Sequence, residues 1–176
     1  MTIGIIGPKG GGKSLVMSAF IAWLDNVLDH QLPIFTSYPL FVNHAKLFTK
    51  WNEIKEQSDC IIGWDEIHLT MDSRNFKSSD SLEYTGWLSI IRHFRTTLVY
   101  TTISMDRIDQ RLRNETDYVW QVQDKGNDIK IQTIDWQTWH LGRSFILSNK
   151  QSFYDLYDSY AIIQPVQMPA KKWGKK

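Results

Sequence analysis

Eight residues near the start of the chain have the types and spacing of a loop that binds phosphate groups. They match the pattern G-x-x-x-x-G-K-[ST] at every position and lie between a strand-like and a helix-like segment. Glycines allow successive backbone N–H groups to point at phosphate oxygens, and the following helix adds a partial positive charge. The residues that we expect to bind the nucleotide are Gly7, Pro8, Lys9, Gly10, Gly11, Gly12, Lys13, Ser14 and Leu15.

Two members of this loop have expected roles toward a bound nucleoside triphosphate. Lys13 is expected to reach the β- and γ-phosphates, and the Ser14 hydroxyl is expected to ligate Mg²⁺. The alternative, a flexible glycine turn, is disfavoured because the match lies in a strand–loop–helix frame. The G-x-G-x-x-G pattern of dinucleotide-binding enzymes is absent from the loop, which disfavours a nicotinamide or flavin enzyme.

Two adjacent carboxylates, Asp65 and Glu66, follow the apolar run Cys60–Trp64. An aspartate at a strand end can hold Mg²⁺, and the glutamate beside it can orient or deprotonate the attacking water. Taken alone, the pair also fits a solvated turn, but the phosphate loop upstream favours the catalytic interpretation. Because an Asp-Glu pair favours hydrolysis over transfer to a small acceptor, the sequence predicts an enzyme that hydrolyses ATP with Mg²⁺.

Arginines are unevenly distributed, and five of the seven lie within the 22 residues from 92 to 113. A planar guanidinium can stabilise charge on a γ-phosphate, either in the same subunit or from a neighbouring one. The candidates for this catalytic role, in order, are Arg92, Arg111 and Arg113, with Arg74 behind them. The alternative is a set of solvated arginines on two helix faces.

The five histidines show no metal-ligand spacing and have no cysteine partners, so no metal site is predicted at them. Cys60 is the only cysteine, which excludes an intrachain disulfide framework. Its place in an apolar run indicates a core residue.

Alternating strand-like and helix-like segments predict an α/β fold with a mainly parallel sheet sandwiched by helices. The expected strands are Thr2–Ile6, Pro33–Tyr38, Cys60–Trp64 and Thr97–Thr102. The expected helices are Lys13–Leu28, His44–Gln57 and Leu82–Phe94, with a loop over His68–Asp80.

The pattern changes after a short helical candidate, Met105–Asn114. Strands are expected at Tyr118–Gln123, Ile129–Trp136 and His140–Leu147, and a turn signal separates the first two. These strands predict an antiparallel C-terminal edge. We expect one domain over residues 1–164 and a flexible basic tail over residues 165–176.

Composition limits the function classes. The 176 residues carry a net charge of only +1, so contact with nucleic acid must be local rather than spread over the whole surface. No stretch approaches the roughly 20 apolar residues of a membrane span, and the opening apolar run is too short for a signal peptide. The expected location is the cytoplasm.

Beyond the phosphate loop, several segments follow in the order seen in ATPases similar to zonular occludens toxin. They are Ser37-Tyr38-Pro39-Leu40, Trp64-Asp65-Glu66-Ile67-His68, Asp72-Ser73-Arg74, Ile91-Arg92-His93 and Ile108-Asp109-Gln110-Arg111-Leu112-Arg113. The resemblance covers residues 2–120, with a weaker match at Tyr157–Tyr160. These proteins resemble the wider FtsK–HerA class of DNA pumps.

The resemblance implies a P-loop NTPase core in which the fourth strand lies between the strands that carry Gly7 and Asp65. It also implies a homo-oligomeric ring, such as a hexamer, that threads DNA. The chain departs from the family in carrying Thr101-Thr102-Ile103 where a glutamine usually ends the fourth strand, and Thr102 is the expected substitute sensor. It also lacks the membrane span of the toxin-like members, which favours genome packaging over extrusion.

The predicted function is therefore a DNA-translocating motor, encoded by a virus or mobile element, that uses ATP and Mg²⁺. Expected partners are DNA, further copies of the chain, and a viral capsid or membrane protein on which the motor docks. DNA contacts are expected from Arg74, Lys77 and the lysine-rich tail. The alternative is a nucleotide-dependent switch or assembly factor that acts on a protein partner without translocating DNA.

Overall fold

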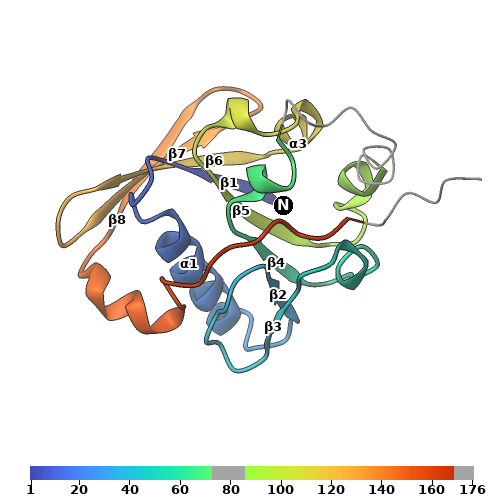
Figure 1. The fold of residues 1–176 in the computed structure, drawn as a ribbon. Helices are drawn as coiled ribbons and strands as arrows, with labels where there is room; N and C mark the ends of the chain where they lie inside the picture. The colour runs from blue at the N-terminus through green and yellow to red at the C-terminus, as the bar shows by residue number, and fades with distance from the viewer. Residues whose placement is uncertain (73–85, 169–176) are drawn as a thin grey trace, which may run out of the picture.

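A single mixed sheet forms the centre of the computed structural model, which describes residues 1–72 and 86–168 (Figure 1). Its strands are β1 (Thr2–Ile6), β2 (Ile34–Thr36), β3 (Ala45–Leu47), β4 (Ile61–Trp64), β5 (Thr97–Thr102), β6 (Tyr118–Asp124), β7 (Ile129–Asp135) and β8 (Leu141–Leu147). The strand order is β3-β2-β4-β5-β1-β6-β7-β8. Strands β3 to β6 in this order run parallel, while β7 and β8 are antiparallel.

This order confirms the predicted parallel sheet with an antiparallel C-terminal edge. Strand β5 lies between β4 and β1, as the resemblance implies, and it pairs with both in parallel. The carboxyl ends of β1, β4 and β5 therefore meet at one edge of the sheet, where ligands of α/β proteins bind.

Helix α1 (Lys13–Val27) covers one face of the sheet. Its buried side chains Leu15, Met17 and Ile21 belong to one apolar cluster with Ile5 and Val99 of the central strands. Successive side chains along a strand point to opposite faces of the sheet, so adjacent residues of β5 pack on different faces. Burial of each of these α1 side chains stabilises the folded state by about 1.5–3 kcal/mol, which holds α1 and the loop before it against the sheet.

The opposite face is covered by short segments rather than by long helices. They are η1 (Trp51–Glu53), η2 (Ile67–Leu69), the helical residues 86–90, η3 (Met105–Arg107) and α3 (Gln110–Asn114). Trp51, Trp64 and Trp87 pack together there, with the rings of Trp51 and Trp87 4.9 Å apart. These three of the chain's eight tryptophans are therefore core residues.

The helix expected over His44–Gln57 is wrong, because this segment forms the edge strand β3 and the 3₁₀ turn η1. Phe48 and Trp51 are buried against the sheet, so tertiary packing overrides the helical spacing. The Glu53 carboxylate accepts the Thr49 N–H at 2.9 Å and the Lys50 N–H at 3.3 Å, which caps the start of η1.

Two other expectations fall partly outside the described residues. Of the expected loop over His68–Asp80, the part up to Asp72 is described and begins with η2. Of the expected helix over Leu82–Phe94, residues 86–90 are helical.

The start of the expected flexible tail is packed instead, since Val166 is buried and the backbone of Gln167 forms hydrogen bonds with Thr49 and Trp51. Across the two described ranges, no helix has the length and hydropathy that a membrane crossing requires.

Candidate nucleotide-binding site

The predicted phosphate loop connects the end of β1 to the first turn of α1. Gly10 and Gly12 have positive φ angles of 74° and 85°, which favour glycine. A Cβ atom on Gly12 would also collide with the side chain of Ile129. Within the loop, the Gly11 N–H donates to the Pro8 carbonyl at 3.0 Å, which fixes the turn that leads into the helix.

The two predicted magnesium ligands lie side by side. The Ser14 hydroxyl is 2.9 Å from each carboxylate oxygen of Asp65, although 51 residues separate them. Ligands at right angles on an ion with bonds of 2.0–2.1 Å lie about 2.9 Å apart, so the oxygen pair fits Mg²⁺. Hard oxygen donors are also the ligands that this ion prefers.

Asp65 is only 5% exposed, and burial raises the pKa of its carboxyl group. Hydrogen bonds from Thr101 (2.5 Å) and Ser14 oppose this rise. The Asp65 N–H donates to the Ser37 hydroxyl at 2.9 Å, which fixes the backbone at the end of β4. Ser37 belongs to the Ser-Tyr-Pro-Leu segment, for which the sequence indicated no role.

Glu66 faces a different set of partners from its neighbour. Its backbone has a left-handed φ of 48°, which is uncommon for a residue other than glycine and often marks a functional site. One carboxylate oxygen lies 3.7 Å from Lys13 Nζ, and the other lies 3.3 Å from His68 Nδ1. The predicted catalytic glutamate is thus between the phosphate-loop lysine and a histidine that sequence reasoning did not single out.

The threonine that contacts the carboxylate pair is Thr101, not the predicted Thr102. The Thr101 hydroxyl donates to Asp65 and accepts the Glu66 N–H at 2.8 Å. Thr102 is the next residue of β5, so its side chain leaves the other face of the strand. Its hydroxyl lies 3.4 Å from His68 Nδ1 and reaches Glu66 only through that ring.

A cleft of about 990 Å³ opens in front of the phosphate loop. Residues 10–15 and Glu66 line one part of it. The rest is lined largely by the C-terminal segment that contains η4 (Lys150–Leu156), including Lys150, Tyr154, Tyr157 and Tyr160. In the sequence, the weak Tyr157–Tyr160 match was the signal for this wall.

The three arginines predicted to act on the γ-phosphate lie outside the cleft at the phosphate loop. Arg92 pairs with Asp117 at 2.7 Å, and Asp117 also accepts the Thr2 N–H at the start of β1, the end opposite the phosphate loop. Arg113 lies 3.5 Å from Asp106, and Arg111 lies beside it on α3. None of the three lines the described cleft. Arg74 and Lys77 lie outside the described residues.

Comparisons with known proteins show what this chain is similar to. A family model described as zonular occludens toxin matches residues 23–161. The crystal structure of the N-terminal domain of zonular occludens toxin from Neisseria meningitidis has a TM-score of 0.63 at 18% identity, and the match covers 89% of this chain and 98% of that one. No curated protein sequence matches the chain.

Two further structures share the fold. The genome packaging NTPase B204 of Sulfolobus turreted icosahedral virus 2, in complex with ATPγS, has a TM-score of 0.59 at 8% identity and is matched over 84% of this chain and 96% of that one. EssC (ATPases 2 and 3) of Geobacillus thermodenitrificans has a TM-score of 0.55 at 10% identity, over 96% of this chain and 46% of that one. At these identities the likeness shows the fold alone.

Proposed function

Because the chain belongs to the zonular occludens toxin family and is a P-loop ATPase by its fold and phosphate loop, we propose that it hydrolyses ATP with Mg²⁺ to move DNA. The observation that carries hydrolysis is the convergence of Lys13, Ser14, Asp65, Glu66 and Thr101 at one edge of the sheet. These residues come from β1–α1, β4 and β5, three separate parts of the chain.

Each of these groups has a distinct part in the proposed reaction. The loop N–H groups and Lys13 bind the phosphates, while Ser14 and Asp65 would hold Mg²⁺, which would supply positive charge beside the phosphates. Glu66 orients the attacking water and accepts its proton. Thr101 fixes the Asp65 carboxylate relative to the backbone of Glu66, because its single hydroxyl donates to the former and accepts the N–H of the latter.

The DNA substrate is the finer part of the proposal. It is supported by the family, and by the fold shared with B204, which is a genome packaging NTPase. We propose further that the chain acts as a ring of identical subunits in the host cytoplasm, docked on a viral capsid or a membrane protein. With a net charge of +1, the DNA contacts must be concentrated where a ring brings repeated basic residues together.

The first test is ATP turnover by the full chain with three variants. Lys13→Ala should lose nucleotide binding or turnover, whereas Glu66→Gln should retain bound ATP and hydrolyse it very slowly. Asp65→Asn should mainly raise the Mg²⁺ concentration required. A Glu66→Gln variant that turns over at the wild-type rate would show that this glutamate is not the catalytic base.

The second test addresses DNA. Turnover is measured with and without duplex and single-stranded DNA over a salt series, and repeated on a chain that ends before Lys171. DNA should accelerate hydrolysis, and log affinity should fall with log salt by about 0.9 per duplex phosphate contacted. Absence of binding and stimulation in the assembled oligomer would reject the motor and leave the ATPase in place.

A second candidate function, a switch that acts on a protein partner, is favoured by an apolar groove. The groove has a volume of about 420 Å³ between α1 and the antiparallel strands. Trp23 and Ile146, which line it, are 57% and 67% exposed. Exposed apolar surface of this kind marks contacts with other proteins. ATP turnover that responds to a bound protein and not to DNA would support the switch.

A further inference from the structure

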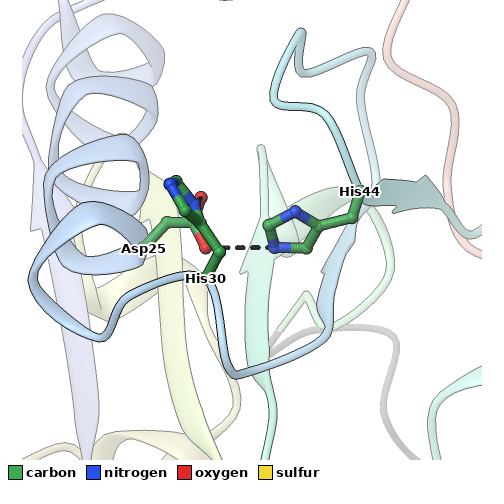
Figure 2. A group of neighbouring side chains, drawn as sticks. All are labelled: Asp25, His30 and His44. Carbon is green, nitrogen blue, oxygen red and sulfur yellow. Dashed lines mark hydrogen bonds and ion pairs between the residues drawn. The ribbon is translucent and has the colours of Figure 1, made fainter.

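Three side chains that the nucleotide site does not use converge at the other end of α1. Asp25 lies in the last turns of that helix, His30 lies just after it, and His44 precedes β3 (Figure 2). Asp25 is 12 residues after Lys13, which places it about 18 Å from the phosphate loop along the helix. The group is therefore separate from the site that binds ATP.

The carboxylate of this group is buried and only partly satisfied. Asp25 is 2% exposed, and its Oδ2 lies 2.6 Å from His30 Nδ1. Its Oδ1 lies 3.0 Å from His44 Nε2, yet no hydrogen bond of acceptable geometry joins them, and among residues 1–72 and 86–168 neither atom has another hydrogen-bond partner. A buried carboxylate oxygen without a partner is costly, so a ligand that satisfies it would be favoured.

A divalent metal ion fits the donors present. The three ligand atoms lie within 4.8 Å of one another, and tetrahedral ligands on Zn²⁺ lie about 3.3 Å apart. The separations of 2.6 and 3.0 Å need only a small opening, which the side chains of His30 and His44 can supply, since they are 55% and 33% exposed. Imidazole nitrogens suit Zn²⁺ and disfavour Mg²⁺ or Ca²⁺.

We propose that Asp25, His30 and His44 bind one Zn²⁺ ion, with water as the fourth ligand, and that the ion fastens the end of α1 to the β2–β3 edge of the sheet. Both histidines coordinate in the neutral form, so any proton on His30 Nδ1 or His44 Nε2 leaves on binding. The sequence predicted no metal site at the histidines because the ligands are spread over 20 residues, in no recognised spacing. Only the fold brings them together.

The experiment titrates Zn²⁺ into the full chain, without a polyhistidine tag, after treatment with a chelator and its removal. Calorimetry should give one ion per chain in the absence of nucleotide, and Co²⁺ in place of Zn²⁺ should give the visible absorption of a four-coordinate site. Asp65→Asn should bind Zn²⁺ as the wild type does, which separates this site from the Mg²⁺ ligands.

The variants His30→Gln and His44→Gln each remove one ligand from a solvent-accessible position. Each should weaken Zn²⁺ binding by more than the roughly 10–100-fold that loss of an outer-shell partner costs. The matched control is His140→Gln, an exposed histidine before β8, which should bind as the wild type does. Zn²⁺ should also raise the thermal midpoint of the wild type and of His140→Gln but not of His44→Gln. Absence of binding, or equal affinity in all three variants, would overturn the proposal.

Discussion

Asp65 and Glu66 are adjacent in the chain, yet their side chains serve different partners. Asp65 contacts Ser14, while Glu66 lies between Lys13 and His68. The left-handed backbone of Glu66 separates them, and the Thr101 hydroxyl bonds to both residues. The Thr101 hydroxyl of β5 therefore connects the carboxylate of the metal ligand with the backbone of the proposed base.

We predict that Thr101→Ala lowers kcat for ATP at least tenfold, because a hydrogen bond to a buried carboxylate contributes about 1.5–3 kcal/mol. Thr101→Ser retains the hydroxyl and should recover most of the rate. Thr102→Ala is the matched control and should cost much less. The measurements are kcat, KM for ATP and the Mg²⁺ dependence of each variant. Equal losses in Thr101→Ala and Thr102→Ala would contradict the geometry.

The sequence predicted the phosphate loop and the carboxylate pair because both are local patterns at strand ends. The sequence did not show which of Thr101 and Thr102 contacts Asp65 and Glu66, because a one-residue change of register moves a side chain to the other face of a strand. The pairing of Trp64 with Tyr100 sets that register, and it depends on the folded sheet. The role of His68 was also missed, because its ring meets Glu66, which follows β4, and Thr102 of β5 only in the folded sheet.

Among the elements, most strands were predicted well, including the edge strand β8, whereas the opposite edge around β3 and the segment around η4 were not. The run Thr97–Thr102 coincides with β5, because apolar and β-branched residues covered on both faces give a clear signal. The segment from His44 to Gln57 has helix-like spacing, but its apolar residues pack against the sheet edge instead. The wall of the cleft around η4 was not predicted because it has no regular periodicity.

We predict that Trp51→Ala destabilises the protein by about 3–5 kcal/mol, since Trp51 is 1% exposed and packs against two other tryptophans. If Trp51 lay on an exposed face of the helix expected over His44–Gln57, the same substitution would destabilise the protein far less. Trp139→Ala is the control, because that side chain is 68% exposed, and it should cost less than about 1 kcal/mol. Urea denaturation followed by circular dichroism measures both, and similar midpoints would contradict the packing.

For the whole molecule, the position of the arginines limits how a phosphate could be contacted. Arg92 lies at the amino end of β1, and the phosphate loop follows the carboxyl end of the same strand. Arg92 can therefore act on a γ-phosphate only from a neighbouring subunit, and Arg111 and Arg113 do not line the described cleft of their own subunit. This requirement connects catalysis to the proposed ring.

We predict that subunits carrying Arg92→Ala, mixed with subunits carrying Lys13→Ala, recover part of the activity that each lacks alone. Recovery is expected because some interfaces of the mixed ring then combine an intact phosphate loop with an intact arginine. Arg111→Ala and Arg113→Ala are tested in the same way, and Arg143→Ala, on β8, is the control that should stay active alone. Full, concentration-independent turnover by a monomer would contradict the prediction.

The position of β1 also determines the order in which the protein can fold during synthesis. β1 lies between β5 and β6, and Thr2 pairs with Leu98, which is 96 residues later in the chain. At about 5–20 residues per second, the ribosome needs roughly 5–20 s to make that partner. Until then the apolar strand that precedes the phosphate loop has α1 beside it but neither of its partner strands, so the loop can reach its native position only after β5 has been made.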